Sequence, residues 1–162
     1  MTDELKKIIF SQKISNVFRE HKWIINIDSE SKFHSYFVGE IADYYLNVYH
    51  DKDKIYLQFT LDLEIPNNII NELLVLINIA NENSQEGFFV FDCRLCKIKY
   101  NLISPYFIDT KETYFNDFLK INLALTKSLF HNLASGIHNL VYGEKIESNS
   151  LELLFTKIKG CA

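Results

Sequence analysis

The stretch PNNIINELLVLINIANENSQEGFFVFDCRLCKIKYNL, from Pro66 to Leu102, decides the fold of this chain. Pro66 stands where a helix tolerates proline, in its first turn, because no intrahelical hydrogen bond needs the missing N–H. Apolar residues then recur at helical spacing as far as Asn83, and Gly87 opens two short strands. The buried stripe of this helix comprises Ile69, Ile70, Leu73, Leu74, Ile77 and Ala80. A helix followed by a hairpin specifies an architecture, but no reaction.

The register of this hairpin follows from its residues. With the turn at Arg94 and Leu95, two apolar pairs share one face of the hairpin. These pairs are Phe91 with Ile98 and Phe89 with Tyr100. Asp92 falls opposite Lys97 on the other face, so an acid meets a base. Both faces therefore favour the same pairing.

Alternation with a period of two predicts the strands before this unit. Ile55, Leu57, Phe59, Leu61 and Leu63 alternate with mostly polar residues, as in an antiparallel strand that is covered on one side. The same period predicts a strand around residues 44–48, joined to the first by a turn at 51–54, and residues 33–38 supply a third strand. A helix over about residues 3–21 precedes them, followed by a polar turn at 28–32. The predicted fold class is α+β: helix, three-stranded antiparallel meander, helix, β-hairpin, long helix and short C-terminal helix.

The long helix, residues 112–142, has more apolar surface than one core contact needs. Its apolar sector spans roughly 200°, about twice the width of a single core-facing stripe. One edge of this sector must face the sheet. The flank on the other edge then remains to be covered by something else, and the sequence does not say which flank that is. The possible interface residues are Tyr114, Ile121 and Leu125 on one flank, Leu123 and Phe130 on the other, and Phe155 of the terminal helix. We expect a homodimer through this surface, with coverage by the terminal helix as the alternative.

Asn122 and Thr126 lie near the middle of that apolar sector. Either they bond to neighbouring groups of the same helix, or they fix the register of a helix-to-helix contact between subunits.

Composition excludes several functional classes. The formal net charge is −4, and the cationic residues include only two arginines, Arg19 and Arg94, so nucleic-acid binding is disfavoured. No run of 18 apolar residues and no signal peptide is present, which predicts no membrane partner and a cytoplasmic location. Three cysteines fit a reducing compartment better than a disulfide framework. The exposed tyrosines Tyr45, Tyr49 and Tyr56 favour a peptide-binding or covered sheet face over a base-stacking platform.

Candidate chemical groups are sparse. Cys93-x-x-Cys96 lies in a hairpin turn without the further ligands that zinc needs, so we interpret the pair as reduced structural cysteines, with a regulatory disulfide or a metal as alternatives. His131 and His138 are two helical turns apart, too far to share an ion without a third ligand. We therefore predict no catalytic, cofactor-binding or metal-binding residues, and a protein that is not an enzyme.

The element order resembles the YbjN family of bacterial proteins, whose fold looks like that of type III secretion chaperones. The strongest matches are Leu76, Asn78, Asn81 and Gly87, which resemble the family's helix end before a glycine and an aromatic strand. The turn at Gly143 and the capped helix at 148–154 resemble the family's closing segment. The likeness runs over residues 23–162, after an N-terminal helix at 1–22, so the chain is expected to form one YbjN-like domain over 1–162. It departs from the family's glycine or acidic turn at 93–96.

This resemblance implies a non-enzymatic protein-binding module, either a YbjN-like regulator of sensory transduction or a chaperone-like adaptor, with a protein partner of unknown identity. The competing hypothesis is a small-ligand-binding protein or an enzyme that uses the cleft between sheet and helix.

Overall fold

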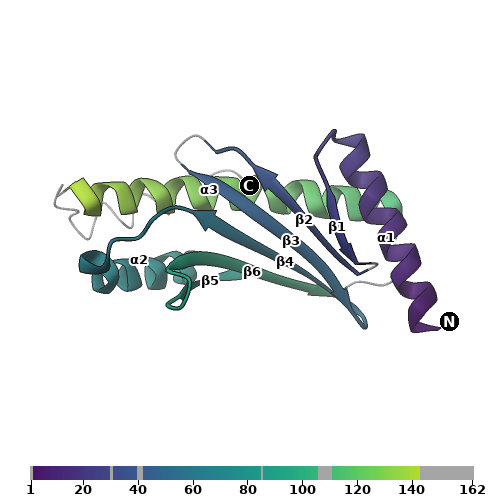
Figure 1. Ribbon diagram of the computed structural model, residues 1–162, viewed down its shortest axis with the longest axis horizontal. Helices are drawn as coiled ribbons and strands as arrows, with labels where there is room; N and C mark the ends of the chain where they lie inside the picture. The colour runs from purple at the N-terminus through teal and green to yellow at the C-terminus, as the bar shows by residue number, and fades with distance from the viewer. Residues whose placement is uncertain (1, 30, 40–41, 85, 106–110, 143–162) are drawn as a thin grey trace.

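A computed structural model describes residues 2–29, 31–39, 42–84, 86–105 and 111–142 (Figure 1). The predicted terminal helix after residue 143 lies outside the described residues. The elements, in chain order, are α1 (Asp3–Glu20), β1 (Asn26–Ser29), β2 (Lys32–Phe37), β3 (Asp43–Asp51), β4 (Lys54–Asp62), the 3-10 turn η1 (Asn67–Ile69), α2 (Ile70–Asn83), β5 (Gly87–Asp92), β6 (Lys97–Pro105) and α3 (Glu112–Tyr142). The α+β prediction is thus confirmed.

The six strands form one antiparallel sheet in the order β1-β2-β3-β4-β6-β5. The register predicted for β5 and β6 is confirmed, with Phe89 opposite Tyr100 and Asp92 opposite Lys97. The meander, however, has four strands and not three, because the predicted turn at 28–32 contains the end of an additional strand. All four residues of β1 are exposed, so this edge strand lacks the alternation that marks a half-buried strand.

The three helices cover one face of the sheet, and the core lies between them (Figure 1). α3 runs behind the strands in this view, with α1 at one end and α2 at the other. Phe10 of α1 joins these layers, because its ring centroid lies 5.8 Å from that of Phe33 on β2 and 6.3 Å from that of Phe115 on α3. Along β4, residues that point to the helices are buried while their neighbours are not, which confirms the predicted period of two.

α2 closes the outer edge of the sheet at β5. The Asn81 side chain accepts a hydrogen bond from the N–H of Phe89 at 2.5 Å and donates one to the carbonyl of the same residue at 3.0 Å. One side-chain amide therefore pairs with both the N–H and the carbonyl of Phe89, which would otherwise be unpaired at the edge of the sheet. α2 itself begins at Ile70, since Pro66 caps the preceding 3-10 turn and does not start the α-helix directly.

Gly87 and Gly136 allow two close contacts around this edge. A Cβ on Gly87 would lie 2.5 Å from Cζ of Tyr100, so only glycine lets β5 start beneath that ring. A Cβ on Gly136 would lie only 3.0 Å from Cδ2 of Leu76. The absence of a side chain at Gly136 therefore lets α2 pack closely on α3. Leu76, Asn81 and Gly87 thus have packing roles, whereas Asn78 is exposed.

Candidate functional site

The structure separates the predicted interface residues into two groups. Tyr114, Ile121 and Leu125 are 66%, 57% and 42% exposed on one flank of α3. Leu123 and Phe130 are only 6% and 3% exposed, so the second flank faces the chain's own sheet and is not free for a partner. Phe155 lies outside the described residues.

Phe130 is buried because it lies among the aromatic residues of the core. Its ring centroid is 5.9 Å from that of Tyr44, 6.4 Å from that of Phe59 and 5.7 Å from that of Phe89. These three residues come from β3, β4 and β5, so Phe130 contacts the sheet across most of its width. Of the two flanks that the sequence leaves open, the one with Leu123 and Phe130 is therefore the one that faces the sheet.

This flank forms a regular apolar row, which we call the α3 seam. It consists of the exposed Tyr114, Ile121 and Leu125 and the half-buried Phe118, which also packs against the core. The spacing of four, three and four residues is that of the a and d positions of a coiled coil, which keeps the side chains on one line along a helix. A pocket of about 420 Å³ lies between this row and β6. Leu102 and Ile103 contribute to its wall. Apolar surface of this kind marks an interaction site more often than an isolated exposed leucine does.

Asn122 and Thr126 are buried on the sheet-facing side of α3, 5% and 1% exposed. The Asn122 amide donates a hydrogen bond of 2.8 Å to the carbonyl of Phe118, one turn earlier. This bond supports the interpretation that Asn122 bonds within its own helix. The Asn122 side chain also lines the pocket beside the α3 seam.

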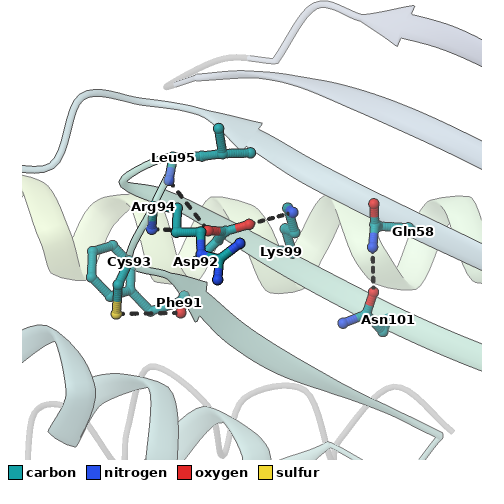
Figure 2. Close-up of polar contacts among 8 residues, drawn as sticks. All are labelled: Gln58, Phe91, Asp92, Cys93, Arg94, Leu95, Lys99 and Asn101. Carbon is teal, nitrogen blue, oxygen red and sulfur yellow. Dashed lines mark hydrogen bonds and ion pairs between the residues drawn. The ribbon is translucent and has the colours of Figure 1, made fainter.

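The turn of the second hairpin is organised by Asp92 (Figure 2). Its carboxylate accepts hydrogen bonds from the backbone N–H groups of Arg94 and Leu95, at 3.0 and 3.2 Å, and from the Lys99 ammonium at 2.6 Å. These donors, Lys99 first, hold the pKa of Asp92 below its usual range. The ion-pair partner of Asp92 is thus Lys99 and not the directly opposite Lys97, which pairs with Asp62 on β4.

Cys93 and Cys96 are both free thiols in this turn. Cys93 is exposed, with its Sγ 4.0 Å from the carbonyl oxygen of Phe91 (Figure 2), and Cys96 is half-buried. Within the described residues, no group of three or more His, Cys, Asp and Glu side chains could hold a metal ion. His131 and His138 are exposed on α3, as expected from the sequence.

The face of the sheet that lies away from the described helices carries aromatic and amide side chains. Tyr49 and Tyr56 stack at 4.5 Å between ring centroids. Gln58 of β4 donates a hydrogen bond of 3.0 Å to Asn101 of β6 (Figure 2). Tyr36 donates a hydrogen bond to the Asp43 carboxylate, which raises the pKa of Tyr36 to about 12. Lys97 and Lys99 on this face are paired with Asp62 and Asp92.

None of the helices in the described part of the chain is both long and apolar enough to cross a membrane.

The structure is that of an α+β protein in which the three described helices lie on one face of an antiparallel sheet, and α3 carries a row of apolar side chains, most of them exposed. No family model matches the chain, and no curated protein sequence does. Among solved structures, the chain is similar to YbjN from E. coli, described as a candidate transcription regulator, with a TM-score of 0.59 at 10% sequence identity. The similarity covers 79% of this chain and 92% of the YbjN chain. At this identity the likeness establishes a YbjN-like fold.

Proposed function

We propose that this protein is a non-enzymatic protein-binding module of the bacterial cytoplasm, a YbjN-like regulator or chaperone-like adaptor. The observation that carries the proposal is the α3 seam, an apolar row on a helix whose opposite side is already occupied by the core. A helix with two apolar sides is stable in water when both are covered. The YbjN-like fold is consistent with a regulatory role, although a fold by itself does not specify a function.

A second copy of the chain is the partner that the seam itself favours. In an antiparallel arrangement of two α3 helices, Tyr114 of each copy faces Leu125 of the other, and Phe118 faces Ile121. The row is thus self-complementary, as a twofold interface requires. A dimer of standard size would bury about 800 Å² on each copy, and the pocket beside β6 offers room for partner side chains.

Site-specific photo-crosslinking in the native cytoplasm tests protein binding. A photoreactive phenylalanine analogue at position 121, on the seam, should give discrete crosslinked products. The matched control carries the analogue at the exposed residue Asn71 of α2 and should give far less. Mass spectrometry of the products separates a second copy from a different protein. Equal crosslinking from both positions, or a co-purified metabolite with no protein crosslink at all, would contradict the proposal.

A further inference from the structure

A second pocket lies at the opposite flank of α3, where the helix passes the connection between β2 and β3. It has a volume of about 340 Å³, which is within the range of small-molecule sites. Its floor is formed by Tyr44 of β3 and Phe130 of α3, both buried in the core. We call it the sheet–helix pocket.

The pocket exists because the residues around its floor are small. Gly39 and Ala42 line it from the β2–β3 connection, and Ala124, Ser128 and Ala134 line it from α3. Larger side chains would fill the hollow at Ala134, which is buried, and close its mouth at Ala124 and Ser128, which are exposed. The hollow therefore follows from side-chain size along one flank of a long helix.

The rim carries one lysine and one histidine among its described residues, and the positive charge comes from the lysine. Lys127 and His131 are four residues apart, so they stand one above the other on α3. No Asp or Glu belongs to the described lining of the pocket, and no salt bridge of Lys127 is seen in the described part of the chain. Burial raises the pKa of Tyr44, so its phenol stays neutral at physiological pH and adds no negative charge. An apolar floor under a positive rim fits a molecule with an apolar body and an anionic head.

We propose that the sheet–helix pocket binds a small amphipathic organic anion, one that places an apolar body on Tyr44 and Phe130 and a carboxylate, sulfonate or phosphate group beside Lys127. The site is separate from the α3 seam and does not depend on the proposed protein binding.

Two dyes that share an apolar skeleton test both parts of this proposal. The first, 1-anilinonaphthalene-8-sulfonate, carries a sulfonate, whereas N-phenyl-1-naphthylamine has the same rings without the charge. Fluorescence titration of the full chain should show one saturable site that prefers the charged dye by about tenfold, and decanoate should displace it. Lys127→Gln should remove most of this preference while the uncharged dye still binds.

Filling the pocket supplies the matching steric test. Ser128→Phe and Ala124→Phe each place a ring at the exposed mouth, where circular dichroism can verify that the fold is kept. Either variant should weaken binding of both dyes at least tenfold. Ile121→Asp on the α3 seam is the control and should leave dye binding unchanged. The proposal is overturned if no saturable site is found, if both Phe variants bind normally, or if Ile121→Asp abolishes binding, since the dye would then occupy the seam.

Discussion

At the scale of single residues, Asn81 gives the clearest case of a side chain whose role follows from where the backbone needs partners. Asn81→Ala would leave the N–H and the carbonyl of Phe89 without this partner. Because the site is partly open to water, we expect a loss of about 1–3 kcal/mol in the free energy of unfolding. Asn78→Ala, three residues earlier and exposed, should change it by less than about 0.5 kcal/mol. Denaturant melts of the two variants provide the comparison, and similar losses would mean that the amide does not secure the sheet edge.

Cys96 is a residue under backbone strain. Its φ is +49°, in the left-handed region where a side chain costs roughly 1–2 kcal/mol relative to glycine. Cys96→Gly should therefore stabilise the protein by about 1 kcal/mol, less the entropy that glycine adds to the unfolded chain. Cys93→Gly is the control, because the φ of Cys93 is not positive. Chemical denaturation under reducing conditions measures both, and an equal effect of the two substitutions would argue against strain at position 96.

His50 links stability to pH. Burial, reinforced by the nearby Lys6, lowers the pKa of this imidazole, while Asp51, Asp53 and a backbone hydrogen bond to Lys52 oppose the shift. A folded-state pKa below the unfolded value means that protonation favours unfolding, so the stabilising contribution is present above about pH 6.5 and is lost as the pH falls below it.

The corresponding prediction concerns the pH dependence of unfolding. Between pH 7.5 and pH 5, the midpoint of urea denaturation should fall less for His50→Gln than for the wild-type chain. The variant gives up the stacking of the imidazole on Phe10, at 4.9 Å between ring centroids, so its stability at pH 7.5 should be lower from the outset. Parallel pH profiles for the two proteins would exclude His50 as the titrating group.

At the scale of elements, the two faces of β4 should differ sharply in their tolerance of substitution. Phe59 is fully buried under the helices, so Phe59→Ala should cost about 3–5 kcal/mol through lost burial and the cavity left behind. Gln58 points to the face away from the described helices, where its bond to Asn101 can be replaced by water, so Gln58→Ala should cost less than about 1 kcal/mol. Guanidinium melts compare the two neighbours directly, and equal costs would contradict the assignment of the faces.

The elements also explain which parts of the fold and site could be predicted from the sequence. Both strands of the second hairpin have an apolar face, so only one register pairs Phe89 with Tyr100. β1 was missed because an exposed edge strand has no such face. The periodicity of α3 predicts two apolar flanks. Which flank meets the sheet depends on how the helix crosses the strands, so the sequence alone does not place Leu123 and Phe130 in the core. The sheet–helix pocket could not be predicted, because small residues define it only once helix and sheet are packed together.

At the scale of the whole molecule, the position of α3 separates the two proposed sites. The helix is 31 residues long, about 46 Å at the usual rise per residue. It presents the seam beside β6 and the sheet–helix pocket beside the β2–β3 connection, on opposite flanks. The two proposed occupants would therefore contact the same helix without competing for the same surface.

The last prediction is the oligomeric state. The chain of 19.0 kDa should behave as a dimer in light scattering at micromolar concentration. Ile121→Asp together with Leu125→Asp should convert it to a folded monomer, because each carboxylate would lose its hydration in an apolar interface. Leu95→Asp, also on an exposed apolar residue but in the β5–β6 turn, should leave the dimer intact. Leu123→Asp should instead unfold the chain, since Leu123 is part of the core. A monomeric wild-type protein would remove the second copy as occupant of the seam, whereas a dimer that survives the double substitution would place the interface elsewhere.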